Sequence, residues 1–290
     1  MMVLELFIWG AWLPLVWKYL DAIGFTTAQQ LWIGSTFGIS SILAIFFSNQ
    51  FADRNFSAER FLAFSHLIGG LAILGLYFTR DFGVFFTLML VHSLFYLPTL
   101  SVTDSIAFAN LSNPQRDFGF VQMGGAIGWI LAAWPLYGLL HGKIGAELVA
   151  ARSCIFIVSG VASLILAAFC FTLPHTPPKP AVKEEDRFAW LESVKLLGIP
   201  YLFVLYLVTF LDSTIHNGYF LMADSFLEKT GFNPEITMPV MSIGQVAEIA
   251  SMAVLGLVLK RFGWKATCYL VSAAMRRASP CLLLCLLIIR

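Results

Sequence analysis

Long uninterrupted apolar runs constrain this chain more than any other feature of its sequence. A helix needs about 20 apolar residues to cross the roughly 30 Å hydrocarbon core of a bilayer, whereas the strands of a membrane barrel alternate in polarity. The runs here are continuous, and 59% of the 290 residues are hydrophobic against 12% charged, which excludes a soluble domain. The sequence therefore predicts an all-α membrane protein with spanning helices near residues 2–20, 29–52, 60–79, 82–111, 118–141, 153–173, 199–223 and 236–259, and a further one from 264 onward.

The basic residues of the predicted loops indicate how these helices are oriented. Cytoplasmic loops of membrane proteins are enriched in Lys and Arg. With a cytoplasmic N-terminus, the inner loops hold the larger set, which is Arg54, Arg60, Arg116, Lys179, Lys183, Arg187, Lys195, Lys260, Arg261 and Lys265. The outer loops then hold only Lys18, Arg80, Lys143, Arg152 and Lys229. We therefore predict a multi-pass protein of the cell (inner) membrane with its N-terminus in the cytoplasm.

A polar, proline-containing stretch divides the chain into two parts. Residues 174–198 combine several prolines with mixed charge, which is typical of a solvated linker. Because six predicted helices precede it, we predict a six-helix N-terminal bundle over 1–173, a cytoplasmic linker over 174–198 and an incomplete C-terminal bundle over 199–290, with a seventh, an eighth and part of a ninth helix. This is the layout of secondary transporters that consist of two parallel six-helix halves.

Each part also carries a short basic turn after its second helix. Phe-Ala-Asp-Arg ends at Arg54 in the first part, and Lys-Arg-Phe-Gly ends at Gly263 in the second. The match predicts the same hinge in each half, with Asp53 and Arg54 as gating residues. The alternative explanation is that any short cytoplasmic turn carries basic residues.

Several function classes lack the residues that they need. A net charge of +1 provides no basic surface for nucleic acid. The five cysteines form no Cys-x-x-Cys pair and no zinc spacing, so we expect no metal site. The phosphate-binding Gly-x-x-x-x-Gly-Lys-Ser/Thr motif is absent, and no nucleophile is paired with an oriented base. We therefore expect neither an enzyme nor a bound cofactor.

Glu248 is the most conspicuous ionisable residue inside an apolar run. A charged group at mid-membrane costs at least about 2.5 kcal/mol, so such groups are candidate functional residues by default. Gln245 and Glu248 share one face of the predicted helix 236–259 because they lie one turn apart. That face suits a polar ligand better than lipid. A structural contact with another helix is the alternative.

The predicted seventh helix holds a second set of polar residues. Asp212 and His216 are four residues apart and can touch across one turn, and Asn217 follows them. A carboxylate beside an imidazole can relay protons, because histidine titrates near neutral pH. A self-neutralised pair in a packed bundle explains the same spacing equally well.

The fourth and fifth predicted helices carry polar stripes as well. His92, Tyr96, Thr99 and Thr103 fall on one stripe of the fourth, for which hydrogen bonding between helices is the favoured explanation. In the fifth, Gln122 precedes a Gly-x-x-x-Gly pair at Gly124 and Gly128 and Trp129 follows it, so an amide and an indole face similar directions. They border one cavity, or the indole belongs to ordinary bundle packing.

Several segments together resemble the nucleoside:proton symporters of the major facilitator superfamily. The matching runs are Ile8–Leu13, Tyr96–Leu100, Gly125–Trp129, Phe171–His175 and Met241–Glu248, and they follow the family's order along nearly the whole chain. The Tyr-Leu-Pro-Thr-Leu and Met-Ser-x-x-Gln-x-x-Glu runs are the more specific ones. The resemblance implies the major facilitator fold and a site in which Gln245 and Glu248 hold the ribose or base, with Glu248 also coupling to protons.

The resemblance implies further binding residues, each at a position where this chain departs from the family pattern. Gln122 stands where a family member has an arginine, Trp129 where it has a phenylalanine, and Asn217 where it has a glutamine. An Arg to Gln change removes a fixed fork of donors, so the substrate can differ from a classical nucleoside. A sugar or another small polar solute therefore stays open as the alternative substrate.

The function that the resemblance implies is proton-coupled uptake of nucleosides by alternating access. Its partners are a nucleoside or other small polar solute, protons and the lipid bilayer, with no nucleic acid. The family has two six-helix halves, whereas this chain ends in its ninth predicted helix, so we expect the chain to be incomplete. A non-transporting truncated remnant or a membrane partner subunit is the alternative outside transport.

Overall fold

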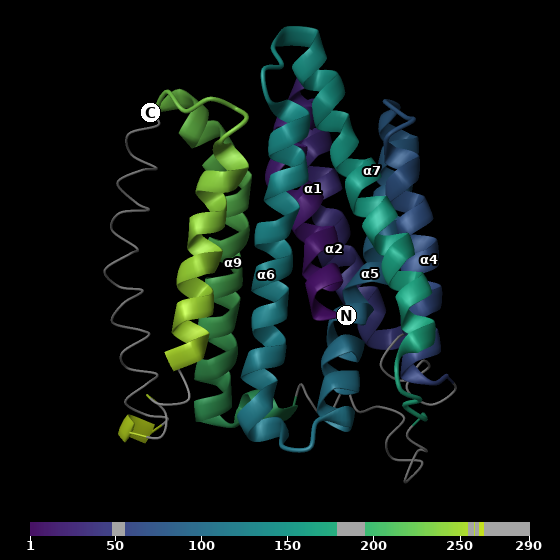
Figure 1. Ribbon diagram of the computed structural model, residues 1–290, viewed down its shortest axis with the longest axis vertical. Coiled ribbons are helices and arrows are strands. Elements are labelled where there is room, and N and C mark those ends of the chain that lie inside the picture. The colour runs from purple at the N-terminus through teal and green to yellow at the C-terminus, as the bar shows by residue number, and fades with distance from the viewer. Residues whose placement is uncertain (48–55, 179–194, 255–257, 259–260, 264–290) are drawn as a thin grey trace. The chain divides into compact units, whose positions relative to one another are not determined.

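The fold of the chain is helical throughout the part that the structure describes. The computed structural model describes residues 1–47, 56–178, 195–254, 258 and 261–263, and none of these residues lies in a strand (Figure 1). The chain divides into two compact units, residues 1–246 and 247–290. The prediction of an all-α fold is confirmed.

Within the described residues, six α-helices precede the polar stretch. They are α1 (Met2–Ala22), α2 (Thr27–Phe47), α4 (Ala58–Leu76), α5 (Phe82–Asn110), α6 (Pro114–Leu140) and α7 (Gly145–Phe169), and the short 3-10 helix η2 (Cys170–Thr172) follows the last of them. Among the described residues, α1, α4, α5, Asp117–Leu140 of α6 and Gly145–Thr172 are long and apolar enough to cross a membrane. Beyond the polar stretch come η4 (Leu196–Gly198), α9 (Pro200–Lys229) and the helical residues 237–254.

The structure corrects two helix ends that hydropathy placed too far inside. Helix α7 begins at Gly145 rather than near residue 153, and α9 runs to Lys229 rather than ending near residue 223. The extra turns carry charged side chains. A search for continuous apolar residues leaves such turns out, although an α-helix can extend through them. Two of these side chains, Arg152 and Glu228, form an ion pair with each other. The predicted helix from residue 264 onward lies outside the described residues.

The first helix is central to the packing of the six-helix bundle. Helix α1 packs against α6 and α7, α4 packs against α5 and α7, and α2 packs against α5 (Figure 1). The buried core of the first unit includes side chains from α9 as well, among them Phe220 and Ala223, which join Trp12 and Trp129. Helix α9 is therefore positioned against α1 and α6 by apolar packing.

Glycine allows the close approach of α1 and α6. A Cβ atom added at Gly128 would lie 1.9 Å from the carbonyl oxygen of Val3, and one at Gly10 would lie 2.9 Å from the ring of Trp129. Gly128, the second glycine of the Gly-x-x-x-Gly pair, therefore lies where α1 and α6 are in close contact. Gly38 in α2 differs, because an added Cβ atom there meets nothing within 4 Å.

This difference between two helical glycines gives a stability prediction. Gly128→Ala is expected to lower the free energy of unfolding by about 1–3 kcal/mol, because the new methyl group forces α1 away from α6. Gly38→Ala is the matched control and is expected to leave stability unchanged or to raise it by up to about 1 kcal/mol, since alanine is the better helix former. Thermal unfolding of both variants in the same detergent measures the difference, and equal losses would contradict the packing of α1 on α6.

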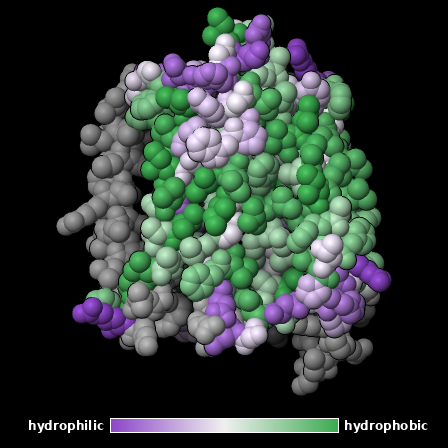
Figure 2. Space-filling model, viewed as in Figure 1, coloured by the Kyte–Doolittle hydropathy of each residue, from purple (hydrophilic) through white to green (hydrophobic). Residues whose placement is uncertain are grey.

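The outer surface of the helices is apolar over much of its length. Figure 2 shows hydrophobic residues across the middle of the visible face, with hydrophilic residues gathered toward both ends. Large side chains such as Phe78, Trp134 and Phe171 are exposed by 81%, 61% and 79%. A continuous apolar exterior of this kind is solvated by lipid rather than by water. The structure therefore agrees with a multi-pass membrane protein.

Candidate functional site

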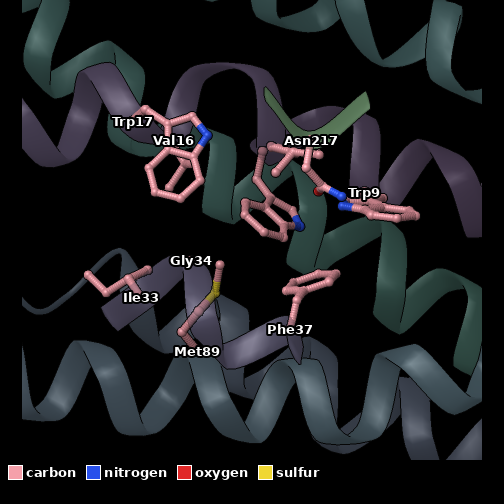
Figure 3. A pocket seen from close by; sticks show the side chains of 10 residues that line it. Trp9, Val16, Trp17, Ile33, Gly34, Phe37, Met89 and Asn217 are labelled. Carbon is pink, nitrogen blue, oxygen red and sulfur yellow. The ribbon is translucent and has the colours of Figure 1, made fainter. Parts of the chain in front are cut away.

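A pocket rich in tryptophan lies between α1, α2, α5 and α9. Trp9, Trp12 and Trp17 contribute from α1, Phe37 from α2 and Asn217 from α9 (Figure 3). The three tryptophans reach one side of α1 because their spacing approximates one and two helical turns. Figure 3 shows Asn217 next to Trp9, with Phe37 and Met89 on the facing wall. The pocket thus combines side chains of the N-terminal bundle with one from α9.

The three indoles of the pocket carry hydrogen-bond donors that are not used within the described structure. Nε1 of Trp9, Trp12 and Trp17 is buried in each case and has no acceptor among the described residues. An indole has a single N–H and can only donate. Buried donors of this kind usually have a partner, so their shared lack of one points to a ligand or water that supplies acceptors. The wall therefore offers aromatic faces and N–H donors to a group that brings acceptor atoms.

Asn217 adds a polar group to this otherwise aromatic wall. Its Nδ2 donates to the backbone carbonyl of Ser213, one turn earlier in α9, at 2.8 Å. This bond leaves the side-chain oxygen as an acceptor at the pocket. Of the predicted binding residues, Asn217 is the one that the structure places in the pocket lining.

Trp129 lies behind the pocket rather than in its lining. Its ring is 6.1 Å from that of Trp9 in an edge-to-face arrangement, and 5.0 Å from the ring of Phe220 on α9. Only 6% of Trp129 is exposed. Trp129 therefore supports Trp9 from the side of α6 and links it to α9.

Neither Gln122 nor Trp129 belongs to the lining of this pocket. The Gln122 amide donates to Oδ1 of Asp104 at 2.8 Å, which joins α6 to α5. Asp104 is half-buried, and the amide gives this carboxylate a partner inside the bundle. Gln122 therefore acts as a contact between two helices, and the sequence interpretation of a shared cavity with Trp129 is not supported by the lining of the pocket.

The predicted binding residues of the C-terminal part fall in different units of the chain. Gln245 belongs to the first unit and is half-buried, whereas Glu248 belongs to the second and is exposed. The predicted gating residues Asp53 and Arg54 lie outside the described residues, and so does the side chain of Asp212. The ring of His216 is exposed and packs against Phe220, with 4.9 Å between ring centroids.

Charged residues join the N-terminal bundle to α9 near the C-terminal end of that helix. Glu228 accepts from Lys18 of α1, and its other oxygen lies 2.6 Å from a guanidinium nitrogen of Arg152 on α7. Arg152 is 5% exposed, and Asp224, which is 3% exposed, interacts electrostatically with both cations. The cluster of Lys18, Arg152, Asp224 and Glu228, here called the ion cluster, therefore connects three helices.

A buried polar cluster in the N-terminal bundle escaped the sequence interpretation. Glu5 of α1 and His66 of α4 are each 1% exposed, and Glu5 Oε2 lies 3.0 Å from His66 Nε2. Thr99 and Thr103 donate to the same carboxylate at 2.6 Å and 3.2 Å. The stripe on the fourth predicted helix was a signal for this cluster, because its threonines and Tyr96 face Glu5. Among the described residues, no group of three or more His, Cys, Asp or Glu side chains is arranged to hold a metal ion.

Comparisons with known proteins agree with this architecture. The family described as "Nucleoside H+ symporter" matches residues 1–279. The chain is 33% identical to the putative nucleoside transporter YegT of Escherichia coli K12. The aligned region covers 95% of this chain and 65% of that protein. The chain is 27% identical to the xanthosine permease of the same organism, over 91% of this chain and 65% of the permease. The chain thus spans about two thirds of the length of these relatives.

The fold also matches solved structures. The crystal structure of the nucleoside transporter NupG superposes on this chain with a TM-score of 0.69 at 22% sequence identity. The superposed region covers 90% of this chain and 66% of the NupG chain. A mutant form of the same transporter gives a TM-score of 0.72. At this identity the likeness establishes the fold, which is the transporter fold that the sequence predicts.

Proposed function

Because the chain belongs to the nucleoside H+ symporter family, we propose that it acts in proton-coupled uptake of nucleosides by alternating access. The single observation that carries this proposal is the tryptophan-lined pocket. It combines the amide of Asn217 with three indole donors that have no acceptor among the described residues. The names of the relatives, a nucleoside transporter and a xanthosine permease, point to the same class of substrate. An enzyme is not favoured, because the family is one of transporters.

The chemistry of the pocket supports a nucleoside better than a free sugar. A nucleobase offers a flat face for the rings of Trp9 and Phe37 and acceptor atoms for the indole N–H groups. A sugar has hydroxyls but no aromatic ring that could stack on these side chains. The aromatic wall therefore favours the nucleoside over the alternative of another small polar solute.

The remaining predicted binding residues keep proposed roles in binding or in support of the pocket. We propose that Gln245 binds the ribose or base and that Glu248 binds substrate and proton. Trp129 holds Trp9 in place, as its ring contacts on both sides support. Gln122 acts indirectly, through Asp104, rather than by direct contact with the substrate.

The ion cluster suits a gate between the N-terminal bundle and α9. We propose that the protein belongs to the cell (inner) membrane and that its N-terminus is cytoplasmic. In this orientation the members of the ion cluster lie at the outer ends of their helices. Breaking the contacts of Glu228 to Lys18 and Arg152 separates the two sides and opens the outer face. Asp53 and Arg54 remain the proposed hinge at the cytoplasmic side. Alternating access then moves one half against the other around the pocket.

Uptake into vesicles tests the proposed function. Proteoliposomes that contain the protein are expected to accumulate a radiolabelled nucleoside when the outside is made acidic. Accumulation should end when a protonophore collapses the pH gradient, because the proton gradient supplies the work. Excess of a second nucleoside should compete, whereas free ribose should not. Accumulation that persists without the gradient, or that ribose blocks as well as a nucleoside does, would contradict the proposal.

A further inference from the structure

The Glu5 and His66 pair is the most deeply buried ionisable pair among the described residues of the N-terminal bundle, and the pocket does not use it. Both side chains are 1% exposed, and the Nε2 to Oε2 distance is 3.0 Å. Among the described residues, His66 is the only basic side chain in ion-pair contact with Glu5. An intramembrane carboxylate needs a partner or a function. The number of protons on the pair decides whether it carries a net charge inside the bundle.

One hydroxyl on the histidine side of the pair has two possible acceptors. Ser163 Oγ lies 2.9 Å from the backbone carbonyl oxygen of His66 and 3.2 Å from His66 Nδ1. A serine hydroxyl has one proton to donate. When it donates to the carbonyl, Nδ1–H donates to Ser163, and a second ring proton at Nε2 makes the imidazole cationic. When it donates to Nδ1, the ring is neutral and its Nε2–H donates to Glu5.

A second hydroxyl on the glutamate side has the same property. Thr99 Oγ1 lies 2.6 Å from Glu5 Oε1 and 2.5 Å from the backbone carbonyl oxygen of Tyr96. With an ionised Glu5, Thr99 donates to the carboxylate. With a protonated Glu5, the Oε1–H group donates to Thr99, and Thr99 donates to the carbonyl of Tyr96. The hydroxyls of Ser163 and Thr99 can therefore rotate so that the side chains of the pair stay hydrogen-bonded, both before and after the pair gains one proton.

We propose that the Glu5 and His66 pair is a proton-binding site of the N-terminal bundle, in addition to the site proposed at Glu248. In the proton-free state, Glu5 is a carboxylate that accepts from neutral His66, Thr99 and Thr103. Uptake of one proton from water makes the pair neutral, either as imidazolium with carboxylate or as imidazole with carboxylic acid. The pair's part in coupling rests on the proposed function, whereas its binding of a proton does not.

Other titratable groups surround the pair on several elements. The amino group of Met1, Asp104 of α5 and the Cys170 thiol of η2 each interact electrostatically with Glu5. Tyr96 does so as well, and its hydroxyl donates to the backbone carbonyl of Glu5 at 2.6 Å. His92 of α5 interacts with His66. Any titration measured at the pair must therefore be assigned by substitution of its own members.

The pair is linked by direct contacts to the proposed substrate pocket. Glu5 and Trp9 lie four residues apart in α1 and so share one face of the helix. The ring of Tyr96 contacts both His66 and Trp9, with its centroid 6.0 Å from that of His66 and 6.2 Å from that of Trp9. A proton that shifts the hydrogen bonds of Glu5 or Tyr96 therefore acts on a residue that lines the pocket.

Spectroscopic titration of the full chain tests this site without any substrate. Histidine ring NMR signals, assigned with His66→Gln, and the infrared absorption of protonated carboxyl groups are followed across the pH range in which the chain stays folded. We expect one of the two signals to report the gain of a single proton at the pair, and we expect Glu5→Gln to abolish it. Glu59→Gln is the matched control, because Glu59 also pairs with a histidine at 2.8 Å, and that partner, His175, has a side chain that is 67% exposed.

The outcomes separate this inference from the proposed function. A transition that is lost in Glu5→Gln and kept in Glu59→Gln supports the proton site, whatever the transported substrate is. Should Glu5→Gln fail to fold, the wild-type titration assigned with His66→Gln alone decides the question. A constant protonation state of both His66 and Glu5 over the whole range would overturn the inference. Nucleoside uptake that persists in the presence of such a constant state would leave the proposed function intact.

Discussion

Replacing Trp9 with alanine is expected to weaken nucleoside binding roughly ten- to a hundredfold, because stacking of a base on an aromatic side chain is worth about 1–3 kcal/mol. Trp9 lines the pocket, stacks on Phe37 with 5.6 Å between ring centroids, and contacts Trp129. Its loss therefore removes both a stacking face and an indole donor that has no acceptor in the described part of the chain. Equilibrium dialysis with a radiolabelled nucleoside measures the effect.

Two further variants separate binding from general packing. Trp9→Phe keeps an aromatic face and removes the N–H group. We therefore expect its affinity to lie between that of the wild type and that of Trp9→Ala. Trp32→Ala is the control, because Trp32 is 58% exposed on α2 and does not line the pocket. Equal affinities for Trp9→Ala and Trp32→Ala would contradict the assignment of the pocket, provided that thermal unfolding shows both variants to be folded.

Replacing Arg152 with methionine is expected to lower the free energy of unfolding by about 3–5 kcal/mol, because it removes the more deeply buried of the two cations that face Asp224 and Glu228. Arg152 is 5% exposed, and it lies 2.6 Å from Glu228 and close to the buried Asp224. Methionine fills a similar volume, so the loss reports the charge rather than a cavity. Chemical unfolding in detergent measures the change.

The control for this prediction is an ion pair of the same type at the surface. Lys143 lies 3.4 Å from Glu147 on an exposed turn, and Lys143→Met is expected to change stability by less than about 1 kcal/mol. The double variant Arg152→Met with Glu228→Gln should recover part of the stability, because one unpaired carboxylate is removed. If Arg152→Met and Lys143→Met were equally mild, the ion cluster would not hold α9 to the bundle.

The membrane helices were predictable because lipid imposes one simple requirement on the sequence. A segment must be apolar for about 20 residues, and this shows in the composition of each run. Helix ends were less accessible, as α7 and α9 illustrate. The turns that the prediction left out carry Arg152 in the first part of α7 and Glu228 at the end of α9. These two charges compensate each other across helices that are far apart in the sequence. No local pattern contains that information.

The candidate site was only partly predictable for a similar reason. Asn217 was singled out through the family resemblance and lies in the pocket, but Trp12 and Trp17 were not, because an apolar helix contains tryptophan for many reasons. Glu5 was missed because it stands near the start of an apolar run, where a charge usually marks a helix end. Its burial depends on His66 and on the threonine stripe of α5, which only the packing of the helices brings together.

Nucleoside binding to the purified chain tests the central claim most directly. The account predicts saturable binding of a radiolabelled nucleoside, displaced by a second nucleoside and not by free ribose, and reduced roughly ten- to a hundredfold in Trp9→Ala. Proton uptake from a weakly buffered solution should accompany this binding, since the proposed cycle moves substrate and proton together. Binding that Trp9→Ala leaves unchanged, or that free ribose displaces as well as a nucleoside does, would contradict the assignment of this pocket to nucleoside transport.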